Sequence, residues 1–386
     1  HTFIDDHTME TAIDASPYAE VSPDRALLVA RMTALYRLAH TAPRLVVASA
    51  AALLRRAIAP EELAPLCAVL GPGQTVDRDR LIALLLGAGF LRAPVVEDAG
   101  SFAVRGGVID VFAPLYRFPV RVELDGDVIE SLRLFDPDTQ RTLRPLPVVH
   151  LHPVRDTVPT RGVDVRARVR DAADAAAHPS VATRRLLEQI EQGGVFVGIE
   201  VLTPAFHRQL VPPWSYLPAD ARWLVLDPAA VGRAAHAELD GADGSFRDRL
   251  AAHQIAFPPA DHWASPDELA AFLASRRHRV LAPTLEILAT EPAPAPDAEL
   301  RFAVDDNHAL RSALERARLQ HADELGRPLA EAVAGWRKNG WRVVIAGDST
   351  SRAERLVGLL GAYGEAPEMC ERAAVCFTGA PRLHPG

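Results

Sequence analysis

The segment at residues 105–142 constrains the fold of this chain more than any other. It combines a short apolar strand, a loop broken by prolines, and two strands in which apolar and polar residues alternate. Asp125-Gly126 stands between the last two strands and is typical of a type I′ turn, because both central residues of that turn need positive φ. With those two residues in the loop, Arg121 would lie opposite Glu130 on the returning strand. The sequence therefore predicts a hairpin that buries one face and presents arginines on the other.

This segment resembles the module shared by UvrB and the bacterial transcription-repair coupling factors (Mfd). The resemblance rests on R-G-G-V-I-D-V-F, which begins at Arg105, and on P-V-R-V-E, in which Arg121 is third. In that family the matching arginines contact the repair protein UvrA, so the resemblance implies UvrA contacts at Arg105 and Arg121. The chain departs from the family at Asp125, where an aromatic residue is usual and would supply an apolar anchor. The alternative is that both arginines are ordinary surface residues, paired with Glu130, Glu123 or Asp110.

Composition sets broad limits on the remaining possibilities. The chain has 386 residues, which suggests two or three domains. Its apolar fraction of 48% and charged fraction of 24% are ordinary for a globular protein. The net charge is −8, so no overall positive field predicts binding to nucleic acid. The basic residues are arginines except for Lys338, a bias that we attribute to genome composition rather than to function.

The sequence shows no signal for a compartment other than the cytoplasm. Three cysteines without a C-x-x-C pair fit a reducing cytoplasm and exclude a disulfide framework or a zinc ribbon. No apolar stretch approaches the roughly 18 residues of a membrane span, and no signal peptide is visible. We therefore expect a cytoplasmic protein with no membrane contact. Because the first residue is His1 rather than Met, we expect a fragment of a longer protein, cut at both ends.

The pattern along the chain predicts an α/β fold built from four segments. Residues 1–98 and 191–290 would form a degenerate helicase-like (UvrB-like) lobe, and residues 99–190 an inserted α+β module that binds UvrA. A Pro/Ala-rich linker at 291–297 would lead to a small, truncated α/β domain at 298–386. The expected strands outside the hairpin are 44–48, 195–200, 222–227, 279–282 and 341–346. The expected helices are 23–40, 77–87, 161–190, 307–338 and one from about 351.

A second resemblance concerns catalysis. Residues 215–229 resemble the acidic box of UvrB-family helicases, where a strand ends in Asp-Glu that holds Mg²⁺ and orients the attacking water. Here Asp227 remains, but Pro228 replaces the glutamate, and proline has no carboxylate. The chain has no G-x-x-x-x-G-K-[ST], and the loop at 347–351 lacks the phosphate-binding lysine. We therefore predict no catalytic residue and no cofactor in this chain.

Two weaker candidates lie elsewhere. Tyr18 is the only tyrosine in residues 16–25, near the place where UvrB carries a tyrosine-rich hairpin that probes damaged DNA, and we expect a packed surface aromatic. His150 and His152 would point the same way on a strand, but a zinc site needs at least three protein ligands and no third is near in sequence. No metal site is predicted.

These features favour a UvrA-recruiting, non-catalytic N-terminal part of a transcription-repair coupling factor, acting in transcription-coupled nucleotide excision repair. RNA polymerase and DNA would be partners through other parts of that protein, whose ATP-dependent motor would lie in its C-terminal half. Two alternatives are a fragment of a UvrB-type, ATP-dependent damage-verifying helicase and a simple DNA-binding module. The broken acidic box and the missing aromatic hairpin argue against the first, and the acidic net charge argues against the second.

Overall fold

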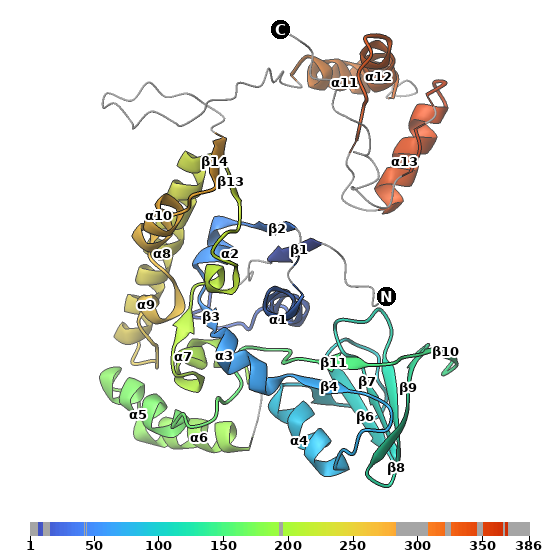
Figure 1. The fold of residues 1–386 in the computed structure, drawn as a ribbon. Helices are drawn as coiled ribbons and strands as arrows, with labels where there is room; N and C mark the ends of the chain where they lie inside the picture. The colour runs from blue at the N-terminus through green and yellow to red at the C-terminus, as the bar shows by residue number, and fades with distance from the viewer. Residues whose placement is uncertain are drawn as a thin grey trace. The chain divides into compact units, whose positions relative to one another are not determined.

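The computed structural model describes residues 7–10, 16–41, 43, 45–192, 196–282, 308–320, 326–345, 350–365 and 367–369. The chain divides into two compact units, His1–Leu288 and Ala289–Gly386 (Figure 1). The first unit contains both helices and several sheets, which confirms the α/β class. No helix of the described residues is long and apolar enough to cross a membrane.

A six-stranded sheet is the largest of the first unit. Its strand order is β10-β9-β8-β7-β6-β5, and all neighbours are antiparallel except β5 and β6. The strands are β5 (Leu91–Arg92), β6 (Ser101–Arg105), β7 (Val108–Val111), β8 (Val120–Asp125), β9 (Val128–Phe135) and β10 (Thr142–Pro145). The predicted strand and hairpin at residues 105–142 are therefore β7, β8 and β9.

Helix α4 (Arg78–Gly87) covers one face of this sheet (Figure 1). Asp77 caps the helix through a hydrogen bond that its side chain accepts from the amide of Arg80, at 2.7 Å. Leu81 and Leu85 are buried and belong to the same core as the inward-facing side chains of the strands. Those strand residues are Phe102, Ile109, Val111, Val120, Val122, Ile129, Leu132 and Leu134. The opposite face is left to the polar residues of the alternating pattern.

The turn between β8 and β9 differs from the predicted one. Asp125 pairs with Val128, so Gly126 and Asp127 form the two-residue loop. Gly126 has φ 58 and comes first in this loop, which is typical of a type II′ turn. The prediction of a type I′ turn at Asp125-Gly126 was wrong, and Asp125 is the last residue of β8.

The strand register differs for a second reason, which is a β-bulge. The pairing shifts between Glu123 and Leu124, and two consecutive residues of β9, Glu130 and Ser131, occupy the place opposite Glu123. Arg121 consequently lies opposite residue 133 of β9, and the predicted pairing with Glu130 was wrong.

Four two-stranded sheets complete the described strands of the first unit. The sheets β1–β2 and β13–β14 are parallel, and β3–β12 and β4–β11 are antiparallel. Their strands are β1 (His7–Glu10), β2 (Leu45–Ala48), β3 (Ala57–Ile58), β4 (Ala68–Leu70), β11 (Val149–Leu151), β12 (Leu210–Val211), β13 (Trp223–Leu226) and β14 (Arg279–Ala282). The strands predicted at 222–227 and 279–282 are confirmed as β13 and β14, and the described part of the one predicted at 44–48 is β2.

Side-chain caps mark the start of several of the remaining helices of the first unit. Helix α10 begins after Ser265, whose hydroxyl accepts from the amide of Glu268 while the Glu268 carboxylate accepts from the amide of Ser265. The predicted helix at 23–40 is confirmed. The helices are α1 (Arg25–His40), α2 (Ala50–Leu54), α3 (Pro60–Leu63), α5 (Val165–Ala175), α6 (Ser180–Glu191), α7 (Thr203–Phe206), α8 (Pro228–Ala251), α9 (Pro259–His262) and α10 (Pro266–Ala274).

A second core unites residues from distant parts of the first unit. Tyr18 is only 4% exposed, and its hydroxyl donates to the carbonyl of Phe257 at 2.6 Å. Leu54 of α2 and Trp263 belong to the same cluster, as do buried residues of α5 to α8. The expectation that Tyr18 is a surface aromatic was wrong, because its ring is enclosed by residues 246–263. A third, smaller core joins α1 to β3 and to Tyr216.

Two further expectations were wrong in the first unit. The described part of the strand expected at 195–200 is a turn followed by a 3-10 helix, η2 (Ile199–Leu202). Gly198 has φ 81 at the start of this helix, which is incompatible with an extended strand. The single helical pattern expected at 161–190 is the pair α5 and α6.

The second unit contains α11 (His308–Gln320), α12 (Arg327–Lys338) and α13 (Thr350–Gly361). The helix expected from about 351 is confirmed, and the one expected at 307–338 is two helices. Residues 341–345 are not a strand, because no described segment of this unit pairs with them. The proposed linker at 291–297 and most of the loop at 347–351 lie outside the described residues.

Candidate functional site

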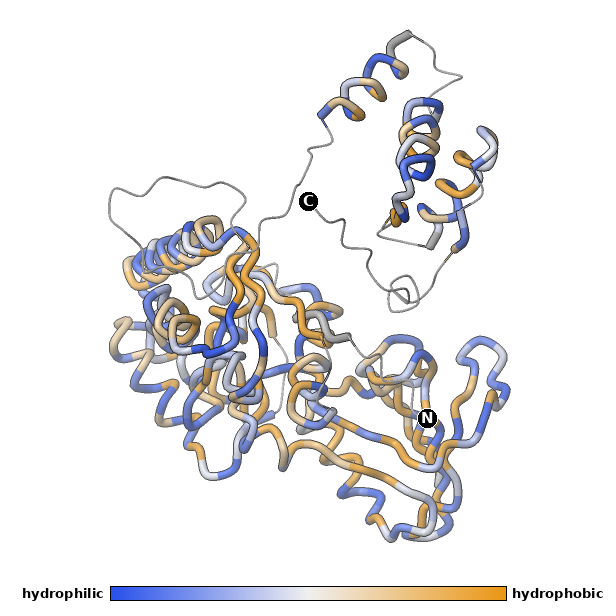
Figure 2. Tube along the Cα trace, turned by 45° about the horizontal axis from the view of Figure 1, so that its top comes forward, coloured by the Kyte–Doolittle hydropathy of each residue, from blue (hydrophilic) through white to orange (hydrophobic). Residues whose placement is uncertain are grey.

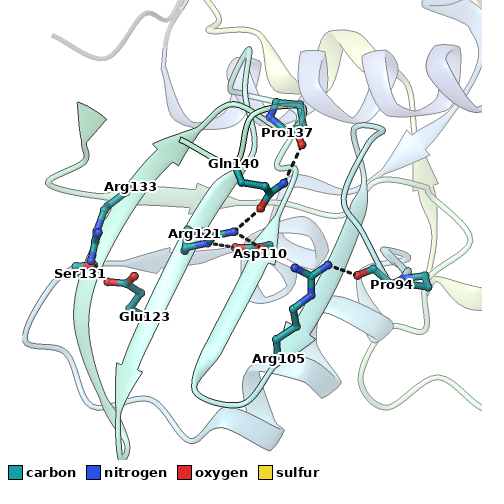
Figure 3. A network of polar contacts seen from close by, with 9 residues as sticks. All are labelled: Pro94, Arg105, Asp110, Arg121, Glu123, Ser131, Arg133, Pro137 and Gln140. Atoms are coloured by element: carbon teal, nitrogen blue, oxygen red, sulfur yellow. Dashed lines mark hydrogen bonds and ion pairs between the residues drawn. The ribbon is translucent and has the colours of Figure 1, made fainter. Parts of the chain in front are cut away.

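The candidate site is the face of the six-stranded sheet that points away from α4. Asp110 lies opposite Arg121 on the neighbouring strand, and Arg105 lies opposite Val108. Residues directly opposite one another, or two apart along a strand, share a face. The strand register therefore brings Arg105 and Arg121 to one side, as Figure 3 shows. We call this surface the polar face, and its members are Arg105, Asp110, Arg121, Glu123, Ser131 and Arg133.

Arg121 is held firmly by its neighbours. Its Nε donates to Asp110 Oδ1 at 2.7 Å and its Nη2 to Asp110 Oδ2 at 2.9 Å, a bidentate ion pair. Nη2 also donates to the carboxamide of Gln140 at 2.9 Å, and the guanidinium lies 4.4 Å from the ring centroid of Phe135. The hydrogen bond to Asp110 raises the pKa of Arg121 above its usual value. The side chain of Arg121 is only 22% exposed, so it does not project freely from the sheet.

Arg105 stands in a different environment. It is exposed at the end of β6, and its Nη2 donates to the carbonyl of Pro94 at 2.8 Å. Among the described residues no carboxylate pairs with it. Of the alternatives that the sequence left open, Asp110 is therefore the partner of Arg121, and none of them is the partner of Arg105.

The two glycines after Arg105 have separate structural reasons. Gly106 has φ 58 in the turn between β6 and β7, a conformation that costs glycine least. Gly107 accepts a hydrogen bond from the amide of Leu124 at 2.8 Å, next to the shift in register. A Cβ atom at Gly107 would lie 2.8 Å from the carbonyl oxygen of Leu124, so no larger residue fits without movement of the backbone. The glycine pair thus fixes the turn that carries Arg105.

Sequence reasoning missed Arg133, which lies opposite Arg121. Arg133 forms an ion pair with Glu123, and Ser131 bridges the two by donating to Glu123 at 2.6 Å and accepting from Arg133 at 3.0 Å. The signal for this residue was the spacing of apolar positions in β9. Ile129 and Leu132 are three apart rather than two, yet both belong to the core on one side of the sheet, and the bulge between them allows this.

The other predicted site residues lie elsewhere in the first unit. Asp125 is exposed at the tip of the β8–β9 hairpin. Asp227 follows β13 with φ 48 and is the N-cap of α8, since its side chain accepts from the amide of Ala230 at 3.0 Å. Pro228 is the first residue of α8, a position that proline favours. Asp227 and Pro228 therefore form a helix cap.

His150 and His152 both contact helix α1. Nδ1 of His150 lies 2.9 Å from the hydroxyl of Tyr36, and Nε2 of His152 lies 3.4 Å from the hydroxyl of Thr33. His152 also stacks on the Tyr36 ring and contacts the carbonyl of Pro153. No group of three metal-binding side chains occurs among the described residues.

Comparison with known proteins identifies relatives of this chain. The family model described as the UvrB interaction domain matches residues 69–156, which include α4 and the whole six-stranded sheet. The transcription-repair-coupling factor of Myxococcus xanthus is 34% identical over 366 residues, which are 90% of this chain and 29% of that protein. Over most of its length this chain is therefore similar to a transcription-repair-coupling factor.

Other transcription-repair-coupling factors match in the same way. The protein from Escherichia coli (strain K12) is 28% identical over 66% of this chain and 22% of its own length. The protein from Mycobacterium bovis is 30% identical over 56% of this chain and 18% of its own length. This chain thus spans less than a third of the length of these curated relatives.

The burial of His152 makes folding of the first unit sensitive to pH. Burial lowers the pKa of His152 to about 4, whereas an unfolded histidine has a pKa of about 6.5. Between these values the unfolded chain binds more protons, so the free energy of unfolding falls as the pH is lowered. We expect a loss of up to about 3 kcal/mol from pH 7 to pH 4 from this residue. Urea titrations of His152→Gln should show a weaker pH dependence of the free energy of unfolding than the wild type, with His236→Gln, at an exposed position of α8, as the control substitution.

The ion pair of Arg121 generates a prediction about stability. Arg121→Ala leaves the carboxylate of Asp110, which is 5% exposed, without its bidentate partner. We expect the free energy of unfolding to fall by about 1–3 kcal/mol. Arg105→Ala should change it by less than about 0.5 kcal/mol, because this side chain is exposed and bonds only one carbonyl. Equal urea midpoints for the two variants would contradict the assignment.

Proposed function

We propose that this chain is the UvrB-like, non-catalytic N-terminal region of a transcription-repair coupling factor and that it recruits UvrA in transcription-coupled nucleotide excision repair. The observation that carries the proposal is the UvrB interaction domain at residues 69–156, in which the sheet brings Arg105 and Arg121 to one face. In this proposal, residues 1–98 and 191–290 form a degenerate helicase-like lobe, residues 99–190 the UvrA-interaction module, and residues 298–386 a small domain.

The polar face suits a partner with carboxylates. Arg105 is exposed and keeps most of its donors available, and arginine forms bidentate pairs with carboxylates. The other charges of the polar face are already balanced, since Asp110 pairs with Arg121 and Glu123 with Arg133. The unbalanced charge on this surface is therefore positive, which supports contact with acidic side chains of UvrA.

The binding prediction follows from these arginines. Arg105→Ala and Arg121→Ala should each weaken binding of UvrA from the same organism by about tenfold or more, because truncating one member of a desolvated interfacial pair costs about 2–5 kcal/mol. Asp125→Phe should strengthen binding, because an aromatic residue at the hairpin tip would restore the apolar anchor that the resemblance implies. The measurement is a titration by calorimetry or fluorescence anisotropy.

The controls separate binding from folding. Arg170→Ala removes an exposed arginine from α5, away from the sheet, and should leave the affinity unchanged. Each variant is first compared with the wild type by urea unfolding, and the titration is run under conditions where both are folded. If the wild type binds UvrA and both alanine variants bind equally well, the assignment of the site is wrong.

The chain itself should not hydrolyse ATP. No P-loop lysine is present in the sequence, and Asp227 caps α8 beside Pro228 where an acidic pair would be needed. In the proposal the ATP-dependent translocase motor, and the contacts with RNA polymerase and DNA, belong to other parts of the parent protein. ATPase activity above the blank that is lost in Asp227→Asn would favour the alternative, a UvrB-type helicase. Binding of DNA that falls steeply with salt would favour a simple DNA-binding module.

A further inference from the structure

The loop between β9 and β10 is built by its own hydrogen bonds. One carboxylate oxygen of Asp136 accepts from the amides of Asp138 and Thr139, at 2.9 and 3.0 Å. The amide of Gln140 donates to the carbonyl of Asp136 at 2.8 Å, and the amide of Asp136 donates to the carbonyl of Arg141 at 3.0 Å. Figure 2 shows this loop, between the last two strands of the sheet, as hydrophilic. A closed loop of this kind presents its side chains in fixed directions.

Gln140 has an unusual backbone in this loop. Its φ is 58, in the left-handed region that residues other than glycine seldom adopt. Its carboxamide bridges two segments: Oε1 accepts from Arg121 Nη2 at 2.9 Å, and Nε2 donates to the carbonyl of Pro137 at 2.8 Å (Figure 3). The side chain of Gln140 is thus fixed at both ends of its amide, and the strained backbone places it against Arg121.

These contacts leave Arg121 one open edge. Nε and Nη2 are occupied by Asp110 and Gln140, and one face of the guanidinium covers the ring of Phe135. Within the part of the chain that the structure describes, no group accepts a hydrogen bond from Nη1 of Arg121. The two N–H groups of Nη1 are consequently the donors that a partner can reach.

We propose that Gln140 is a positioning residue for partner binding: it holds the Arg121 guanidinium against Asp110 so that Nη1 points outward, ready for a carboxylate of the partner. The inference rests on the proposed function, because the partner is UvrA. Since the free protein already fixes the arginine, less side-chain freedom is lost when the complex forms. Gln140 would act through Arg121 and would not touch UvrA itself.

The decisive variant is Gln140→Gly. Glycine keeps the left-handed backbone at no steric cost and removes the side chain with its carboxamide. Ala177→Gly is a matched control, since Ala177 has φ 50 and lies after α5, away from the sheet. Titration with UvrA should show binding weakened about three- to fivefold by Gln140→Gly and unchanged by Ala177→Gly. In the Arg121→Ala background, Gln140→Gly should have no further effect, as expected for two residues that act through one contact.

A measurement on the free protein tests the same idea without UvrA. In a sample labelled with ¹⁵N-arginine, relaxation of the Arg121 Nε should indicate a rigid side chain in the wild type and a more mobile one in Gln140→Gly. Unchanged relaxation in the variant would overturn the positioning role, whatever the affinity for UvrA.

The possible outcomes are distinct. An equal loss of affinity from Gln140→Gly with and without Arg121 would mean that Gln140 contacts UvrA directly, which overturns the inference. If Arg121→Ala weakens binding but Gln140→Gly does not, the inference is wrong and the proposed function stands. If the wild type does not bind UvrA at all, the proposed function fails and the inference fails with it.

Discussion

The extra residue in β9 is the constraint on which the candidate surface depends. Because two residues of β9 occupy the place opposite Glu123, Ile129 and Leu132 can both face the core although they are three apart. Without the bulge, the residues of β9 on one side of it would exchange faces. Leu132 would then lie on the polar face and Arg133 would point into the core. The bulge also places Arg133 opposite Arg121, so the charges of the polar face are arranged by packing beneath the sheet.

Two arginines directly opposite each other would repel if they were left alone. Here each has its own carboxylate on the same sheet, Asp110 for Arg121 and Glu123 for Arg133. These two ion pairs allow the guanidinium groups of Arg121 and Arg133 to lie near each other and fix their orientations. Arg105 differs because its contact is a carbonyl, so its charge is the least neutralised of the three. A partner surface that meets this face would therefore encounter two oriented arginines and one that can adjust.

Much of the fold could be predicted from local signals. The helix at 25–40, the strand at 223–226 and the capping box at Ser265 all depend on residues near one another in sequence. Tyr18 was misjudged because its burial depends on residues more than two hundred positions away. The expected strand at 341–346 failed for a related reason, since a strand needs a partner that the segment itself does not specify.

In the candidate site, too, features that depend on neighbouring residues could be predicted, and those that depend on distant contacts could not. Period-two alternation placed Arg121 on the face away from the core, and the register agrees and brings Arg105 to the same face. The spacing of Ile129 and Leu132 carried the signal for the bulge, but a regular alternation was assumed. The roles of Asp110 and Gln140 could not be predicted, because they depend on side-chain directions. A left-handed glutamine in particular has no signature in sequence, since asparagine and glycine are the residues that usually mark such positions.

The cap at Asp227 has a consequence for any attempt to build an acidic pair at the end of β13. Replacing Pro228 with glutamate would add a carboxylate, but Asp227 would still bind the amide of Ala230 at the start of a 24-residue helix. That bond and the positive end of the helix dipole both stabilise the negative charge of Asp227 where it is. This one substitution would therefore supply an Asp-Glu pair in the sequence, but the carboxylate of Asp227 would still be engaged as a helix cap. As long as α8 begins at Pro228, the carboxylate of Asp227 remains bound to the start of this helix.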